Sequence, residues 1–137
     1  ARPAPAWRYA CQAASTAEKR IRYAAMYDRA FSELSDHINI PPRRPNARRV
    51  FHLYMVEARR RDELLAFLID SGVEAKIHYP IALHLQKGLA HLGYKKGDFP
   101  ESERQTSCII TFPLDEFLTE DQIQYVIETV RRFYKTR

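Results

Sequence analysis

Glycine, cysteine and long apolar runs are scarce in this sequence, and each shortage excludes a class of protein. Only four of the 137 residues are glycine, and the sequence contains no phosphate-binding loop, dinucleotide fingerprint or G-x-S-x-G nucleophile turn. No stretch approaches the roughly 18 consecutive apolar residues of a membrane span, and the first residues lack the apolar block of a signal peptide. We therefore expect a soluble, cytoplasmic protein.

The two cysteines and three neighbouring histidines do not form a metal or redox motif. Cys11 and Cys108 lie far apart in the sequence, so we predict that both are reduced and structural. The spacings of His78, His84 and His91 do not match familiar ligand pairs. If the last two shared a helix, seven residues would separate them by about 10 Å, too far for one ion. No metal site is predicted.

The charge distribution is basic but mixed. Hydrophobic residues make up 45% of the chain and charged residues 28%, as in ordinary globular proteins. The net charge of +5 comes from clusters that could attract phosphates or nucleic acid: Arg43-Arg44, Arg48-Arg49 and Arg59-Arg60-Arg61. Nearby acidic residues dilute this field, and short charge runs usually form a solvated face. The run 48–56 could stack bases, but it lacks the glycine-containing RNA-recognition signature, so nucleic-acid binding stays a minor alternative.

The first half of the chain predicts two helices and two strands after a mobile lead-in at residues 1–14. A capping box at Ser15 and Glu18 begins a helix that should reach Leu34, and a proline-rich connector over 38–46 follows. Residues 50–56 and 73–79 are predicted strands on either side of a helix over 61–71, which Gly72 ends. This order suits a right-handed strand–helix–strand crossover.

The second half predicts a short helix between Pro80 and Pro100, then a further turn capped by Asp98, and a strand over 108–112. A capping box at Thr119 and Gln122 precedes an amphipathic final helix. We therefore expect one α+β domain over residues 15–137, a small and roughly three-stranded, mainly antiparallel sheet covered by helices.

Polar side chains concentrate where the second predicted strand ends. His78, Tyr79, His84 and Gln86 fall within nine residues, beside Pro80. Such a strand exit can form one wall of a polar ligand pocket. The other interpretation is a strand edge with hydrogen-bonded core histidines, which the chemistry of the residues alone favours.

The order of several motifs resembles the C-terminal part of the DegT/DnrJ/StrS family of nucleotide-sugar aminotransferases. The resemblance covers about Lys19 to Tyr134, and residues 1–18 do not obviously continue it. At Ala82 many relatives have a second proline, so this loop is expected to be less rigid. The matching pieces are residues 22–28, 40–42, 50–54, 61–64, 72–80, 84–86, 92–94, 97–100 with Glu103, 112–114 and 118–119.

This resemblance implies the small C-terminal domain of a fold-type I, pyridoxal-phosphate-dependent enzyme. Such enzymes transfer an amino group, usually from glutamate, to a nucleotide-linked keto sugar, in the biosynthesis of deoxyamino sugars or polysaccharides. The large domain carries the cofactor lysine, and none of the lysines here lies in that motif, so this chain alone is expected to bind no pyridoxal phosphate and to be inactive. No catalytic residue is assigned.

The resemblance also implies partners and binding residues. A large cofactor-binding domain, in the same chain or a partner chain, and a homodimer of the complete enzyme are expected. The loop 78–86 would face the nucleotide sugar or a neighbouring subunit. His78 and Tyr79 are the first candidates for hydrogen bonds to the substrate, and His84 and Gln86 are weaker ones. The alternative is a stand-alone, non-catalytic module that binds a ligand or a protein.

Overall fold

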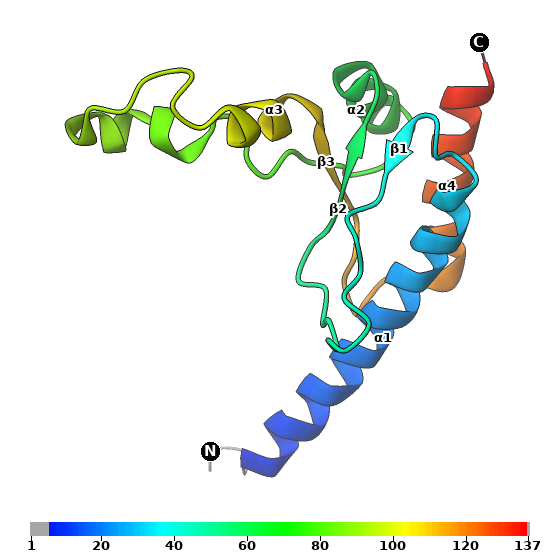
Figure 1. Cartoon of the computed structure of the whole chain (residues 1–137). Helices are drawn as coiled ribbons and strands as arrows, with labels where there is room; N and C mark the ends of the chain where they lie inside the picture. The colour runs from blue at the N-terminus through cyan, green and yellow to red at the C-terminus, as the bar shows by residue number, and fades with distance from the viewer. Residues whose placement is uncertain (1–5, 137) are drawn as a thin grey trace.

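The computed structural model describes residues 6–136, with side chains from residue 14 onward. Helices dominate the ends of the chain, and short strands lie between them (Figure 1). No helix in this described part is long and apolar enough to cross a membrane. The elements in chain order are α1 (Ala6–Ser32), β1 (Ile38–Asn39), β2 (Tyr54–Ala58), α2 (Arg61–Asp70), the 3₁₀ helices η1 (Leu83–Leu85) and η2 (Lys87–Leu92), α3 (Pro100–Cys108), β3 (Ile109–Phe112) and α4 (Glu120–Lys135).

The sheet is three-stranded and antiparallel in the order β1-β2-β3, which confirms the predicted fold class. Tyr54 lies opposite Phe112, and Ile38 lies opposite Ala58. On the far side of β3, Lys76 forms a single antiparallel bridge with Thr111. The backbone around Lys76 therefore runs parallel to β2 with β3 between them, and α2 makes the connection.

Three predictions about the strands were wrong. The first strand begins at Tyr54 instead of residue 50, because Phe51 has a left-handed backbone with φ 50°. The proline-rich connector contains β1, because two of its residues pair with β2. The strand predicted over 73–79 is reduced to the bridge at Lys76, since the Ala75 N–H donates to the Val73 carbonyl in a tight turn that interrupts the extended backbone.

Helix predictions succeeded where a local stop or cap signal is strong. Gly72, with φ 77°, follows the end of α2, and Thr119 and Gln122 form the predicted capping box of α4. The first helix was predicted too short: α1 already begins at Ala6, because alanine-rich sequence has high helix propensity, and Ser15 lies inside it. Asp98 does not cap α3; its carboxylate instead accepts from the Lys95 N–H.

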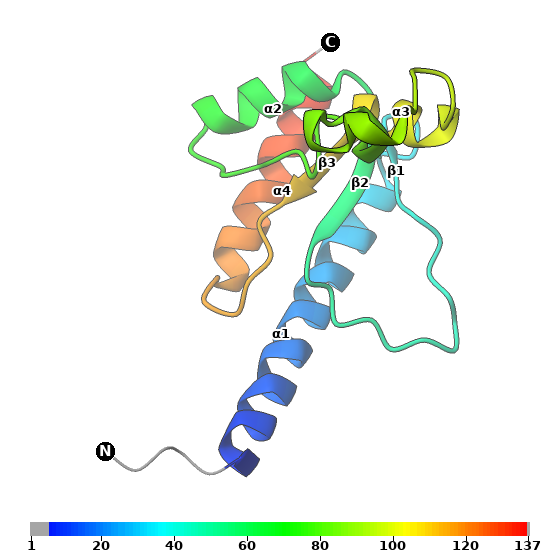
Figure 2. The same ribbon diagram turned by 90° about the vertical axis from the view of Figure 1, so that its left-hand side faces the viewer.

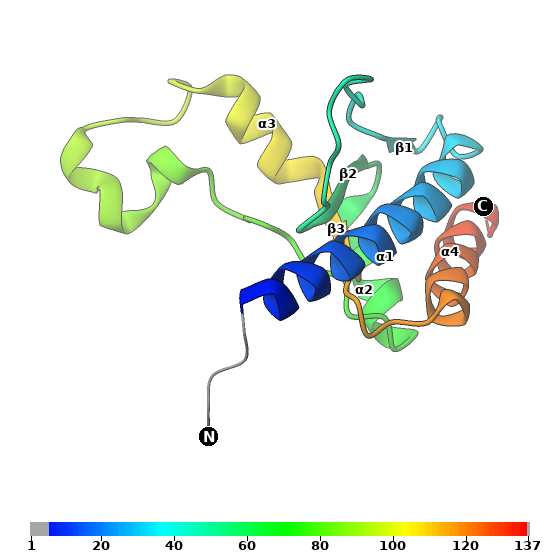
Figure 3. The ribbon, with the colours of Figure 1, turned by 90° about the horizontal axis from the view of Figure 1, so that it is seen from below.

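The long helices lie on one side of the sheet and an extended segment lies on the other. α1 and α4 lie side by side with α2 near the end of α4 (Figures 1 and 2). The N-terminal part of α1 continues past the sheet (Figure 2). Residues 79–99, here called the arm, reach away from the sheet before α3 returns the chain to β3 (Figure 3).

Aromatic side chains fill the space between α1 and the sheet. Tyr27, Phe31, Tyr54 and Phe112 are fully or almost fully buried, and the rings of Tyr27 and Tyr54 lie 4.8 Å apart. The Tyr27 hydroxyl donates to the Pro113 carbonyl at 2.9 Å, and burial raises its pKa well above the usual value. The buried Tyr27 side chain therefore adds apolar area to the core, while its hydroxyl keeps a hydrogen-bond partner.

Candidate functional site

His78 and Tyr79 lie where the chain leaves the edge of the sheet. The half-buried His78 ring has its Nδ1 atom 3.1 Å from the Thr111 hydroxyl on β3. Tyr79 is 66% exposed, its ring meets that of His78 edge-on at 5.6 Å, and the peptide bond between the two residues is cis. The sheet therefore fixes the position of His78, while Tyr79 presents its ring to solvent.

His84 lies in the arm and has a different environment. It is only 8% exposed, and its Nε2 atom lies 3.0 Å from Oε1 of Glu103 on α3. The same carboxylate oxygen accepts from the Gly97 N–H at 2.7 Å. The hydrogen bond from Gly97 is the main cause of a lowered pKa at Glu103, and His84 adds to it. The contact between His84 and Glu103 thus connects η1 to α3 at the base of the arm.

The four candidate residues do not form one cluster around shared partners. His78 contacts β3, whereas His84 contacts α3. Gln86 is half-buried between η1 and η2, and its backbone N–H donates to the Leu83 carbonyl. Of the four, only His78 and Tyr79 have side chains in contact with each other.

The arm exposes several large apolar side chains. A hollow of about 260 Å³ in it is lined by Leu83, His84, Leu89, Leu92, Tyr94, Phe99 and Ser102. Several of these side chains are largely exposed, as are two at its start, Tyr79 and Ile81. Large apolar patches on a folded protein mark surfaces that contact another molecule or domain.

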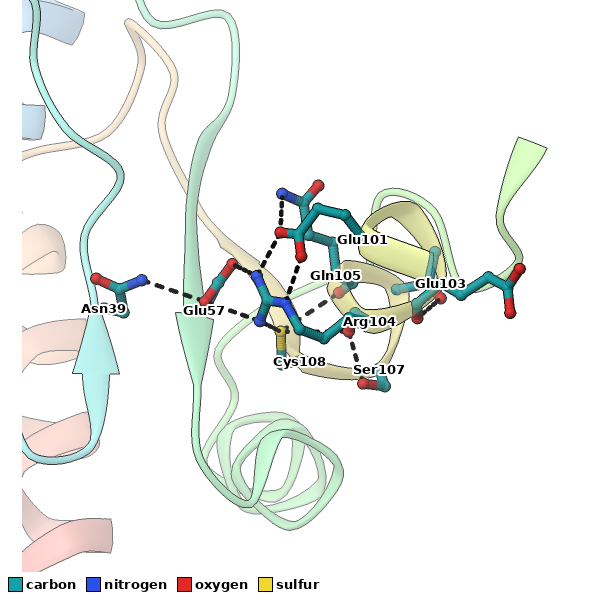
Figure 4. Close-up of polar contacts among 9 residues, drawn as sticks. Asn39, Glu57, Glu101, Glu103, Arg104, Gln105, Ser107 and Cys108 are labelled. Carbon is teal, nitrogen blue, oxygen red and sulfur yellow. Dashed lines mark hydrogen bonds and ion pairs between the residues drawn. The ribbon is translucent and has the colours of Figure 1, made fainter. Parts of the chain in front are cut away.

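A second polar cluster lies on the other side of α3 and connects that helix to the sheet (Figure 4). The Arg104 guanidinium lies between Glu57 of β2, at 2.6 Å, and Glu101, at 2.7 Å. These hydrogen bonds raise the pKa of Arg104, with Glu101 the larger cause, and Arg104 in turn lowers the pKa of Glu57. Asn39 of β1 also donates to Glu57. The cluster borders an open cavity of about 730 Å³, whose lining contains four arginines and four acidic residues.

The lysines are the residues of this chain that could form a Schiff base with pyridoxal phosphate. A Schiff-base lysine needs an enclosed pocket with an acidic partner for the pyridine nitrogen and donors for the phosphate. All six lysines are exposed on the surface; Lys76 pairs with Glu74, and Lys19 donates to the Glu116 carbonyl.

Three polar partners escaped the sequence analysis: Thr111, Glu103 and Arg104. Thr111 reads as an ordinary β-branched strand residue, and nothing in its neighbourhood indicates a contact 33 residues away. Glu103 was noted only for helix capping and for the family motif. For Arg104, the spacing of three residues from Glu101 is a usable signal for a helical ion pair, but the bond to Glu57 depends on tertiary structure.

Comparison with known proteins identifies one family. The model of the "DegT/DnrJ/EryC1/StrS aminotransferase family" matches residues 12–131, so the family pattern begins earlier than the Lys19 expected from the motifs. A pleiotropic regulatory protein of Geobacillus stearothermophilus is 40% identical over 119 residues, 86% of this chain and 32% of the relative. A dTDP-3-amino-3,4,6-trideoxy-alpha-D-glucose transaminase of Streptomyces venezuelae is 31% identical, over 70% of this chain and 25% of that enzyme.

Solved structures give the same result. The structure of S. venezuelae DesV in complex with a ketimine intermediate superposes with a TM-score of 0.82 and 30% identity, over 87% of this chain and 32% of DesV. A DegT/DnrJ/EryC1/StrS aminotransferase from Brucella abortus superposes with a TM-score of 0.75 and 31% identity, over 86% of this chain and 31% of that structure. The chain thus spans about a third of the length of these proteins.

Proposed function

The chain belongs to the DegT/DnrJ/EryC1/StrS aminotransferase family, and we propose that it acts as the small C-terminal domain of a nucleotide-sugar aminotransferase. The complete enzyme would transfer an amino group from glutamate to a nucleotide-linked keto sugar, in the biosynthesis of deoxyamino sugars or polysaccharides. Pyridoxal phosphate, held by a large domain, would supply the electron sink for this transfer. The large domain would be part of the same protein or of a partner chain, and the complete enzyme would be a homodimer.

One observation carries this proposal: the chain superposes on DesV in complex with a ketimine intermediate over 87% of its own length, but on only 32% of the DesV chain. The exposed arm supports it as well. A domain that closes one side of a cleft needs an apolar surface to pack on the other domain, together with a few polar groups aimed at the ligand. The arm supplies the former, and His78 and Tyr79 supply the latter.

The proposed roles follow from the two environments. His78 is held by β3 and would offer a ring nitrogen to an oxygen of the sugar nucleotide. Tyr79 would offer its exposed hydroxyl or the face of its ring. His84, enclosed by Glu103, would act by shaping the arm, and Gln86 would contact the substrate only at its margin. No residue of this chain is proposed to react with the substrate.

A chimaera tests the proposal directly. This chain would replace the matching quarter of the S. venezuelae transaminase, and transamination of the dTDP-linked keto sugar by glutamate would be followed. We expect activity above that of the large domain alone, and loss of most of it in the double variant His78→Ala, Tyr79→Ala. An Ile69→Ala chimaera, changed at an exposed apolar residue of α2, is the matched control. A chimaera that folds and binds the cofactor but shows no activity with any nucleotide-linked keto sugar would contradict the proposal.

Cofactor trapping tests whether the chain needs a large domain. The chain alone would be titrated with pyridoxal phosphate, reduced with borohydride and mapped for labelled lysine. We expect weak labelling spread over the six lysines, because all of them are exposed on the surface. Stoichiometric labelling of one lysine would mean a self-contained cofactor site and would refute the role of a dependent small domain.

A further inference from the structure

Among the described residues, the buried hydroxyl of Thr111 is the only side-chain group that forms a hydrogen bond with the His78 ring. Thr111 is 5% exposed, and its Oγ1 atom lies 3.1 Å from His78 Nδ1. Its backbone is held in turn: the Thr111 N–H donates to the Lys76 carbonyl at 2.8 Å, and the Lys76 N–H donates to the Thr111 carbonyl at 3.0 Å. The two ends of the side-chain contact are therefore set by the sheet and not by a mobile loop.

The number of donors and acceptors at this contact determines which nitrogen of the His78 ring carries the proton. A hydroxyl has one proton to donate, and among the described residues Thr111 Oγ1 has no hydrogen-bond partner besides His78. If the imidazole Nδ1 carried a proton and donated it to Oγ1, the hydroxyl proton would be left buried without an acceptor. An unpaired buried donor is costly, so the hydroxyl donates to Nδ1. In a neutral imidazole the proton then lies on Nε2.

We infer that Thr111 is a positioning residue that holds His78 as the Nε2–H tautomer, so that Nε2 acts as a hydrogen-bond donor to an acceptor oxygen of the ligand. The direction of the bond matters for recognition, since phosphate and carbonyl oxygens accept hydrogen bonds and cannot donate them. The identity of that ligand, an oxygen-rich nucleotide sugar, rests on the proposed function. The tautomer itself depends only on this chain.

Nitrogen NMR of the 137-residue chain tests the tautomer without any ligand. The chain would be labelled with ¹⁵N-histidine, and the His78 signals would be assigned as those that disappear in His78→Gln. We expect Nδ1 to give the signal of an unprotonated nitrogen and Nε2 that of a protonated one. The reverse pattern, or an equal mixture of both tautomers, would overturn the inference.

Two substitutions of Thr111 separate positioning from packing. Thr111→Val keeps the shape of the side chain and removes the hydroxyl, so the His78 signals should shift toward a mixture of tautomers. Thr111→Ser keeps the hydroxyl and should restore the wild-type pattern. Circular dichroism would show that both variants fold. If folded Thr111→Val keeps the wild-type tautomer, Thr111 does not position the ring.

The active chimaera gives a second readout. There Thr111→Val should raise KM for the nucleotide sugar roughly two- to tenfold, which is the range for one lost hydrogen bond, while Thr111→Ser stays near wild type. If the tautomer is as inferred but the chimaera is inactive, the proposed function fails and the inference stands. If the chimaera is active and the tautomer is reversed, the inference alone fails.

Discussion

The core between α1 and the sheet buries its large apolar side chains, whereas the arm leaves many of its own exposed. In the core, Tyr27, Phe31 and Tyr54 are completely enclosed by α1 and the sheet, and both tyrosine hydroxyls find acceptors. In the arm, Leu83 is 66% exposed, and Tyr94 and Phe99 are about half exposed. Burial of apolar area is the main favourable contribution to folding, so the core holds the domain together while the arm adds little.

The arm is nevertheless ordered by polar contacts. Glu103 binds both His84 and the Gly97 N–H, and Asp98 binds the Lys95 N–H in the turn that precedes α3. A segment shaped by hydrogen bonds and covered with apolar side chains is suited to contact with another surface. The comparison therefore predicts that substitutions in the core change stability, and that those in the arm change contact or function.

Two leucine truncations should give the largest difference. Leu68→Ala removes a fully buried side chain of α2 and leaves a cavity, so we expect a loss of about 2–5 kcal/mol in the free energy of unfolding. Leu83→Ala removes the same atoms from an exposed site, and the change should stay within about 0.5 kcal/mol. Urea denaturation of the two variants measures both values. A similar loss in both would mean that the arm is part of the core.

Two tyrosine substitutions test the same contrast between core and arm by removing one hydroxyl oxygen from each region. The Tyr54 hydroxyl donates to Asp28 Oδ1 at 2.8 Å, and the same carboxylate binds the Arg43 guanidinium through two bonds. Tyr54→Phe should lower the free energy of unfolding by about 1–3 kcal/mol, because a hydrogen bond to a charged group is lost in a buried site. Tyr79→Phe, at an exposed phenol, should leave it unchanged. If both variants changed the free energy of unfolding equally, the hydrogen bond from Tyr54 to Asp28 would add nothing to stability.

Sequence patterns predicted the features that depend on local chemistry. The stripe of α4, its capping box and the stop at Gly72 each depend on neighbours within four residues, and all three are present. The sheet class was also predictable from the order of the elements. Features that depend on tertiary pairing were missed: β1 exists only because β2 offers it a partner, and the strand expected at 73–79 shrinks to the bridge at Lys76.

In the candidate site, too, the sequence predicted local placement but not the tertiary contacts. The sequence placed His78 and His84 in one loop, and their separation into two environments follows from partners on β3 and α3 that lie distant in sequence. No local pattern indicates that Thr111 or Glu103 faces a histidine. Whether His78, Tyr79, His84 and Gln86 contact a nucleotide sugar stays a prediction.

Glu103→Ala should have the smallest effect on global stability and the most local one. The Glu103 carboxylate accepts from Gly97 and His84 at the base of the arm, so its loss should speed amide hydrogen exchange at Gly97 and through η1, with no change in the urea midpoint. Glu101→Ala is the matched control, because Glu101 lies on the same helix and binds Arg104 instead. Faster exchange at Gly97 in both variants would assign the effect to α3 as a whole.

The charge on Glu103 gives this local restraint a pH dependence with a definite sign. Gly97 first, and then His84, lower the pKa of Glu103 below its usual 4.5, so the ionised carboxylate is favoured by the ordered arm. The restraint is fully present above 4.5, and it is lost as the pH falls through the lowered pKa. Exchange protection at Gly97 should therefore fall on acidification before the core amides of β2 respond. If Gly97 and β2 lost protection together, the arm and the core would unfold as one unit, and the contrast between them would not hold.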